Sequence, residues 1–239
     1  MQIYYQYSIL QEDFHIILFF FTIPLCPSIL PEFFLIHFQY SVVCRTESCA
    51  LPLNSYKAYK YACDFCGMKI VLVGYMGSGK STVGVLLAQQ LELPFIDLDA
   101  FIEAQEGMKI SELFERKGVV YFRKLERTAL EALKRSSDSF VLATGGGAPC
   151  YGDNMTLINE FANGVVYLKL SIPNLIERLS VEKEKRPLIA HLSKEQMEEF
   201  VRKHLFERSY YYNMAAVVID TSGKTPLEVS TAIQKDMLL

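Results

Sequence analysis

The chain has 239 residues, which is long enough for one ordinary domain with a substantial core. Its 24 basic and 27 acidic side chains nearly balance at a formal net charge of −3, so bulk electrostatics give no sign of a nucleic-acid partner. Only four histidines are present, which argues against a metal site built from histidine.

The first 67 residues differ in composition from the rest. They hold three basic and five acidic residues, which leaves 21 basic and 22 acidic residues for the other 172, a balance typical of a soluble globular domain. They also hold five of the six cysteines, so residues 68–239 contain Cys150 alone and no disulfide framework. This favours a reducing, cytoplasmic location for that part of the chain.

The apolar run "FHIILFFFTIPL" at 14–25 does not fit a known kind of targeting or membrane segment. It is about 12 residues long, whereas a spanning helix needs roughly 20, and no Lys or Arg precedes it as in a signal peptide. The C-x-x-C pair Cys63 and Cys66 lacks the second ligand pair of a zinc site. We expect residues 1–67 to be an extension outside the catalytic fold, with a membrane-associating or interaction segment as the alternative.

Five short apolar runs beyond Met68 predict buried parallel strands, because they are rich in β-branched and aromatic residues and do not alternate. They cover 69–74, 94–99, 140–146, 164–170 and 215–220. Apolar residues at helical spacing lie between them, as in 80–91 and 121–135. The alternation predicts a three-layer α/β/α sandwich with a five-stranded parallel sheet.

The stretch "GYMGSGKS" fits the phosphate-loop pattern G-x-x-x-x-G-K-[ST], with Gly74, Gly79, Lys80 and Ser81 at its fixed positions. It follows a predicted strand and opens a predicted helix, the context in which backbone N–H groups surround phosphate oxygens. Lys80 is expected to contact the β- and γ-phosphates, and the Ser81 hydroxyl to bind Mg²⁺. The pattern alone does not separate a kinase from a GTPase or a motor.

Two further stretches supply candidates for the acceptor side. "FIDLD" places Asp97 and Asp99 at the end of the second strand, where alternation would put both carboxylates on one face. One suits Mg²⁺ and the other an attacking hydroxyl, although both could simply be solvated or helix-capping acids. "ATGGG" ends the third strand with Gly145, Gly146 and Gly147, which allow close approach of backbone to a ligand, or form only a flexible turn.

The motifs "GYMGSGKST", "FIDLD", "YFRKLE", "ATGGG", "KRPL" and "FERSYYYNMA", in this order and spacing, resemble shikimate kinase from Met68 to the C-terminus. The phosphate loop is generic, but the combination of the other motifs is specific. The resemblance implies transfer of the ATP γ-phosphate to the 3-hydroxyl of shikimate, with Mg²⁺ as cofactor, in chorismate and aromatic amino-acid biosynthesis. It also implies a monomeric enzyme whose partner is a small molecule, without a nucleic acid and without a membrane for the catalytic domain.

The resemblance also implies roles for individual residues, which fall into three sets. The ATP set is Gly77, Ser78, Gly79, Lys80, Ser81, Thr82, Arg178 and Arg186. The shikimate set is Asp99, Arg123, Gly145, Gly146, Gly147 and Arg208, and the metal set is Ser81 and Asp97. Asp99, Lys80 and Arg186 would be catalytic, with Asp99 holding the acceptor hydroxyl. Substrate would bind against residues of about 100–135, under a lid of about 178–192 that carries Arg186.

Simpler interpretations of the basic residues remain open at this stage. Arg123 with Glu126 has the spacing of an ordinary i,i+3 helix pair, worth about 0.2–0.5 kcal/mol. Arg208 beside Glu207 has the pattern of a solvated surface charge. Rival functions are a gluconate or nucleoside monophosphate kinase, a nucleotide-binding switch without turnover, and a kinase tethered to a membrane through its first 67 residues.

Overall fold

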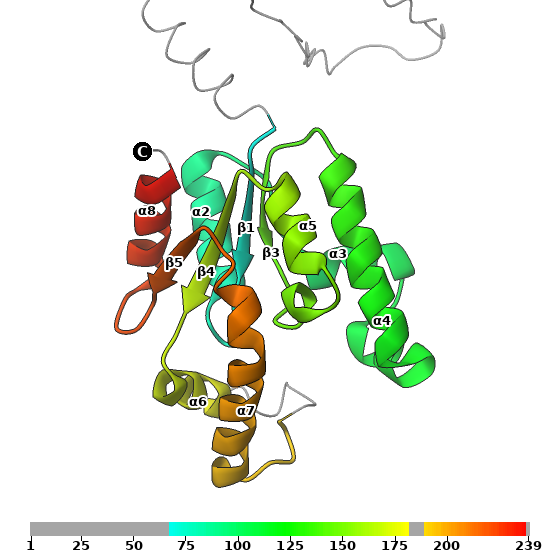
Figure 1. Cartoon of the computed structure of the whole chain (residues 1–239), viewed down its shortest axis with the longest axis vertical. Helices are drawn as coiled ribbons and strands as arrows, with labels where there is room; N and C mark the ends of the chain where they lie inside the picture. The colour runs from blue at the N-terminus through cyan, green and yellow to red at the C-terminus, as the bar shows by residue number, and fades with distance from the viewer. Residues whose placement is uncertain (1–66, 182–188, 238–239) are drawn as a thin grey trace, which may run out of the picture. The chain divides into compact units, whose positions relative to one another are not determined.

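Five parallel strands form one sheet in the order β2-β3-β1-β4-β5 (Figure 1). This computed structural model describes residues 67–181 and 189–237. The strands are β1 (Lys69–Val73), β2 (Phe95–Asp97), β3 (Phe140–Ala143), β4 (Gly164–Lys169) and β5 (Val217–Asp220). All five predicted strands are confirmed. Each lies within its predicted run and is one to three residues shorter than that run. The central strand β1 pairs with β3 on one side and with β4 on the other.

Helices connect the strands, as the alternating pattern predicted. They are α2 (Lys80–Leu91), α3 (Leu98–Glu106), α4 (Ile110–Arg135), α5 (Asn154–Phe161), α6 (Ile172–Val181), α7 (Lys194–Tyr212) and α8 (Pro226–Met237), with a short 3₁₀ turn η1 (Ala148–Cys150). Among the described helices, none is both long enough and apolar enough to cross a membrane.

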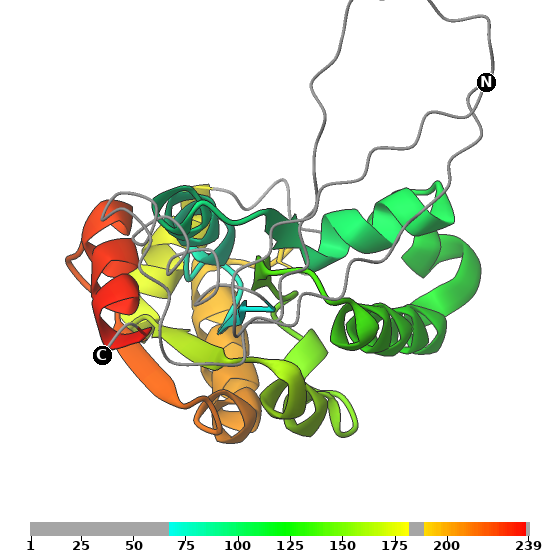
Figure 2. The same ribbon diagram turned by 90° about the horizontal axis from the view of Figure 1, so that it is seen from above.

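The two faces of the sheet pack against different helices, because successive side chains of a strand point to opposite sides. Ile70 and Leu72 of β1 belong to an apolar cluster shared with α2 and α8, whereas Val71 and Val73 belong to a cluster shared with α4, α5 and α7. Figure 2 shows α2 and α8 on one side of the strands and α5 and α7 on the other. The predicted three-layer α/β/α sandwich is therefore confirmed.

The first residue of β1 closes the end of a distant helix. Lys69 is 6% exposed, and its Nζ donates to the backbone carbonyls of Leu133, Lys134 and Ser136 at 3.0, 3.0 and 2.6 Å. The last carbonyls of a helix lack partners within the helix, so an ammonium placed there satisfies them and interacts well with the helix dipole. Lys69 thus fastens the C-terminus of α4 to the central strand.

Helix α4 bends at Gly118, which has a φ of 78° and a ψ of 171°. The part after Gly118 corresponds to the predicted helix at 121–135 and buries Phe122, Ala129 and Leu133 of its predicted apolar stripe. The part before the bend was not predicted. Because a positive φ suits glycine, the bend can stand at this residue without strain and sets the direction of the segment that carries Arg123.

The prediction that Asp97 and Asp99 alternate along one strand is wrong. Strand β2 ends at Asp97, and Asp99 already belongs to the first turn of α3. The Asp97 side chain caps this helix, since its Oδ1 accepts from the backbone N–H groups of Asp99 and Ala100 at 3.0 and 3.4 Å. A capping aspartate favours a helix start over continuation of the strand, and the two carboxylates remain near one another through the turn.

Candidate active site

The phosphate loop lies between the central strand β1 and helix α2. Gly77 and Gly79 have φ values of 79° and 93°, a region that favours glycine and lets successive N–H groups turn toward one side. The Ser78 N–H donates to the Tyr75 carbonyl at 3.2 Å and closes the turn. Helix α2 begins at Lys80, so its N-terminus faces the loop and favours a bound anion.

Lys80 is held inside this loop. It is 9% exposed, and its Nζ donates to the Gly74 and Tyr75 carbonyls at 2.9 Å each. The contacts fix the ammonium next to the loop's N–H groups, where the predicted phosphates would bind.

Ser81 and Asp97 meet at the start of α2. The Ser81 Oγ donates to Asp97 Oδ2 at 2.8 Å, while the other Asp97 oxygen caps α3. Within residues 67–181 and 189–237, no group of three or more His, Cys, Asp or Glu side chains is arranged to hold a metal. A hydroxyl and one carboxylate oxygen fit Mg²⁺ instead, since this ion keeps several waters and takes its other ligands from phosphates.

The Asp99 carboxyl lies against Gly145 of the triple glycine and close enough to Lys80 of the phosphate loop to interact with its charge. An added Cβ at Gly145 would come within 2.9 Å of Asp99 Oδ1. Burial, followed by the nearby Asp97 carboxylate, raises the pKa of Asp99, while Lys80 and Arg123 oppose the rise. These neighbours place a carboxyl with enhanced proton affinity beside the loop that would carry ATP, as a group that accepts a hydroxyl proton requires.

Arg123 and Glu126 form a buried ion pair. Arg123 Nη1 lies 2.6 Å from Glu126 Oε2, and the Glu126 side chain is only 1% exposed. Burial raises the pKa of Glu126 to about 7, although the Arg123 charge and its hydrogen bond oppose the rise. The i,i+3 helix pair is therefore present, but it is not an exposed one: Glu126 points into the protein and contacts the Arg123 guanidinium.

The triple glycine packs directly on the functional side chains. An added Cβ at Gly147 would lie 2.7 Å from Arg123 Nη2, and one at Gly146 would lie 3.1 Å from the Met76 backbone nitrogen of the phosphate loop. The glycine backbone therefore approaches both the arginine and the phosphate loop more closely than any other residue could. This closeness, rather than flexibility alone, explains the three glycines.

Arg208, on helix α7, also contacts the triple glycine. Its Nη1 lies 3.5 Å from the Gly146 carbonyl oxygen, and its guanidinium carbon lies 5.7 Å from the centre of the Tyr75 ring. The residue is half-buried. The interpretation of Arg208 as a solvated surface charge is wrong, because the residue is half-buried and its guanidinium lies against Gly146, in the same triple glycine that packs on Arg123.

The structure describes some, but not all, of the residues that were predicted to bind ATP. Arg178 is exposed on α6, and its Nη1 lies 3.4 Å from the Gly77 carbonyl, beside the phosphate loop. Thr82 is exposed in the first turn of α2. Arg186, and with it residues 182–188 of the predicted lid, falls outside the described residues.

Sequence reasoning did not identify two residues of this site. Glu126 was part of the "YFRKLE" motif but carried no assigned role, and its burial depends on the packing of α4. Tyr212 ends α7 with no exposed surface, and its hydroxyl donates to the Gly146 carbonyl. Its place four residues after Arg208, one helical turn away, is the signal that could have revealed it.

The phosphate loop follows the central strand of a parallel sheet, and Asp99, Arg123 and Arg208 cluster beside that loop. The fold and the site together define a class of protein. It is a phosphate-loop kinase that acts on a small molecule. The family model for shikimate kinase matches residues 76–238 of the chain.

Individual relatives agree with this match. A shikimate kinase of Flavobacterium psychrophilum is 42% identical over 167 residues, which cover 70% of this chain and 97% of the relative. The solved shikimate kinase of Bacteroides thetaiotaomicron has a TM-score of 0.65 at 33% identity and covers 72% of this chain and 98% of its own. The shikimate kinase of Acinetobacter baumannii, solved in complex with shikimate, has a TM-score of 0.67 at 32% identity. The match covers 74% of this chain and 97% of that one. The chain belongs to the shikimate kinase family, whose members use ATP.

Proposed function

We propose that this chain transfers the γ-phosphate of ATP to the 3-hydroxyl of shikimate, giving shikimate 3-phosphate and ADP for aromatic amino-acid biosynthesis. One observation carries the proposal within the family: Asp99, Arg123 and the triple glycine gather immediately beside the phosphate loop. A carboxylated ring with several hydroxyls fits this set, because arginine binds a carboxylate through two parallel N–H donors and Asp99 can accept from a hydroxyl.

On the nucleotide side, the phosphate loop and Lys80 bind the β- and γ-phosphates. Gly77, Ser78 and Gly79 of the loop and Thr82 of the first turn of α2 would bind the nucleotide, and the start of α2 adds its positive end. Ser81 and Asp97 would hold Mg²⁺, which screens phosphate charge when it is bound. Arg178 lies on the nucleotide side of the loop, and Arg186 would reach the phosphates from the lid of about 178–192.

On the acceptor side, Arg123 and Arg208 bind the shikimate carboxylate, with N–H groups of Gly145–Gly147 between them. Asp99 accepts a hydrogen bond from the 3-hydroxyl, orients its oxygen toward the γ-phosphate and takes up its proton as transfer proceeds. Residues of about 100–135 form the other wall. Closure of the lid excludes water, which would otherwise compete as acceptor and hydrolyse ATP.

The test is ADP release from ATP in the presence of shikimate, gluconate or a nucleoside monophosphate, with and without a chelator of Mg²⁺. We expect release with shikimate only, abolished by the chelator and restored by added Mg²⁺. Release with gluconate or a nucleotide, but not with shikimate, would point to a different acceptor. Tight ATP binding with no turnover in shikimate would support a non-catalytic switch.

The same assay, applied to a shortened chain, tests which residues form the catalytic domain. We propose that residues 68–239 are the catalytic domain, that residues 1–67 are an extension outside it, and that the enzyme acts as a cytoplasmic monomer. Support for the domain boundary comes from strand β1, which begins at Lys69. Equal turnover by the full chain and by a chain beginning at Met68, with a monomeric mass in solution, is expected. Sedimentation of the full chain with membranes in cell fractionation would contradict the cytoplasmic part.

A further inference from the structure

The carbonyl groups of the triple glycine all accept hydrogen bonds from the protein, and that of Gly146 has two donors, Tyr212 and, at 3.5 Å, Arg208 Nη1. The Gly145 carbonyl accepts from the Ala148 N–H at 3.2 Å, and the Gly147 carbonyl accepts from the Cys150 N–H at 3.0 Å. The Gly146 carbonyl accepts from the Tyr212 hydroxyl at 2.5 Å. In the described part of the chain, the N–H groups of Gly146 and Gly147 make no hydrogen bond, and both residues are partly exposed. The loop therefore offers donors on its open side.

The hydrogen bond from Tyr212 determines where one of these donors points. The Gly146 carbonyl and the Gly147 N–H belong to the same planar trans peptide, so they point in opposite directions. Holding the carbonyl against Tyr212 turns the Gly147 N–H away from α7. Gly147 is also the glycine that packs on Arg123, with only 2.7 Å between a hypothetical Cβ and Nη2. The N–H and the guanidinium are thus fixed as neighbouring donors.

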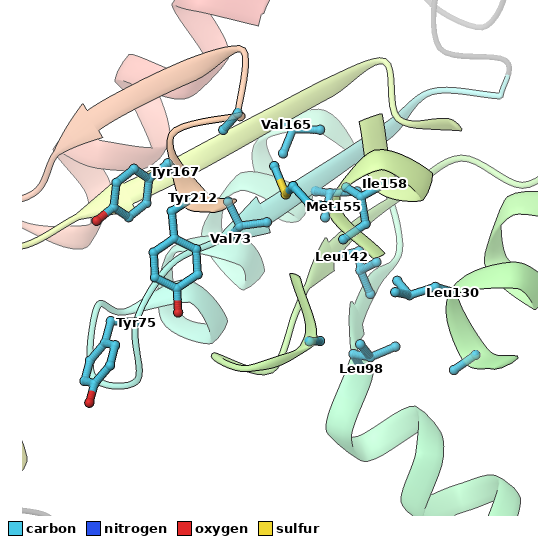
Figure 3. Packing of buried hydrophobic residues seen from close by; sticks show 14 of the residues in the cluster. Val73, Tyr75, Leu98, Leu130, Leu142, Met155, Ile158, Val165, Tyr167 and Tyr212 are labelled. Carbon is cyan, nitrogen blue, oxygen red and sulfur yellow. The ribbon is translucent and has the colours of Figure 1, made fainter. Parts of the chain in front are cut away.

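Tyr212 is built to hold this position and not to touch a ligand. Its side chain has no exposed surface, and its ring stacks on Tyr167 with ring centres 5.2 Å apart (Figure 3). Burial raises the pKa of Tyr212, so its hydroxyl stays protonated and can donate a hydrogen bond. The Cys150 thiol, whose pKa burial raises to about 11, lies near the Tyr212 hydroxyl. Packing and hydrogen bonding therefore restrain both ends of the side chain.

We propose that Tyr212 is a positioning residue for the acceptor site: through the Gly146 carbonyl, it aims the Gly147 N–H at the carboxylate of the acceptor, alongside Arg123 and Arg208. The inference rests on the proposed function, because the acceptor's carboxylate is the anion that these donors would meet. An anion bound by aligned N–H groups loses affinity when one peptide is free to rotate. The phosphate loop does not depend on this peptide, so ATP binding should be insensitive to Tyr212.

The experiment removes one oxygen atom with Tyr212→Phe and compares it with Tyr210→Phe, which removes the same atom from a side chain 72% exposed on the same helix. Steady-state kinetics and calorimetric titration with shikimate are measured on both full-length variants. We expect the shikimate KM and Kd of Tyr212→Phe to rise about tenfold, the size of one lost buried hydrogen bond. The KM for ATP should stay within about twofold, and Tyr210→Phe should match the wild type.

Other outcomes overturn the inference in distinguishable ways. Unchanged shikimate affinity in Tyr212→Phe, with an active wild type, rejects the positioning role alone. Equal rises in both KM values together with a lower Tm assign Tyr212 to general stability. A wild type that binds no shikimate removes the proposed function and this inference together. Should Tyr212→Phe fail to fold, hydrogen exchange on the wild type decides, since the Gly147 amide must exchange more slowly once shikimate is added.

Discussion

Glu126 holds Arg123 from inside the protein: the two side chains lie 2.6 Å apart, and the carboxyl is 1% exposed while the guanidinium remains partly open. The guanidinium, which we propose binds the carboxylate of the acceptor, is thereby oriented before any substrate binds. The arrangement differs from a surface ion pair, because breaking it leaves a charge in a buried place, where it is costly.

The raised pKa of Glu126 makes the stability of the free protein depend on pH. Between the ordinary value of 4.5 and the folded value of about 7, the folded chain holds a proton that the unfolded chain has released. The free energy of unfolding must therefore fall as pH rises through this window, by at most about 3 kcal/mol. Glu126→Gln should lose this part of the pH dependence. Urea midpoints at about pH 5, 6, 7 and 8 for both proteins measure it, and parallel curves would reject the assignment.

Removing the guanidinium should act on the acceptor. Arg123→Ala is expected to raise the KM for shikimate by about 10- to 100-fold, the size of a lost charge-assisted hydrogen bond pair, with little change in the KM for ATP. Arg116→Ala, on the same helix, is the matched control because the Arg116 side chain is 66% exposed and pairs with Glu112 at the surface. A change in the KM for ATP, with that for shikimate unaltered, would show that Arg123 does not bind the carboxylate.

Two alanine substitutions in the triple glycine should separate binding from chemistry. Gly147→Ala places a Cβ 2.7 Å from Arg123 Nη2, so the guanidinium must move and the KM for shikimate should rise. Gly145→Ala places one 2.9 Å from Asp99 Oδ1, so the carboxyl must move and kcat should fall. Because both clashes are with side-chain ends that can shift, we expect losses of about tenfold rather than unfolding. Identical effects of the two variants on kcat and KM would contradict this division.

Asp99→Asn keeps the shape of the side chain but removes its ability to take up a proton. A general base contributes about 100- to 10,000-fold, so kcat should fall by at least about 100-fold, with shikimate still bound. Asp236→Asn, which changes an exposed carboxylate of α8, serves as the control. Single-turnover rates measured with saturating substrates separate chemistry from product release, and an unchanged rate would exclude Asp99 from the chemistry.

Lys80→Ala should abolish turnover while leaving the fold intact. In the proposed reaction the ammonium would stabilise charge on the transferring phosphate, an effect whose loss costs about 100- to 1,000-fold or more. Circular dichroism and Tm test the fold, and Lys235→Ala, an exposed lysine of α8, shows the effect of losing a charge elsewhere. Near-normal turnover by Lys80→Ala would mean that the loop does not bind the reacting phosphate.

The sequence was sufficient for the elements whose signals are local. The five apolar runs and the phosphate loop depend on residue types a few positions apart, and all five strands and the start of α2 at Lys80 were predicted. The end of β2 was missed because the same residue, Asp97, reads equally well as the last position of a strand and as a helix cap. Only its hydrogen bonds to Asp99 and Ala100 decide between the two.

The site was harder to predict, because its energetics depend on burial. Arg123 and Glu126 show the spacing of an ordinary helix pair, and nothing within four residues reveals that one of them faces the core. The role of Tyr212 depends on a contact with Gly146 across 66 residues of sequence. Such long-range contacts have no local pattern, so motif order could suggest which residues act but not how they support one another.

The central position of β1 also bears on how the protein is made. This strand is synthesised before either of its neighbours, since β3 begins about 70 residues later and β4 about 95 residues later. Lys69 likewise cannot bind the carbonyls of Leu133, Lys134 and Ser136 until residues 133–136 have left the ribosome. Folding by such long-range pairing is slow, and the early strand stays exposed to aggregation and chaperones in the meantime. Because the phosphate loop leaves this same strand, acquisition of ATP binding during translation would report when the sheet has closed around it.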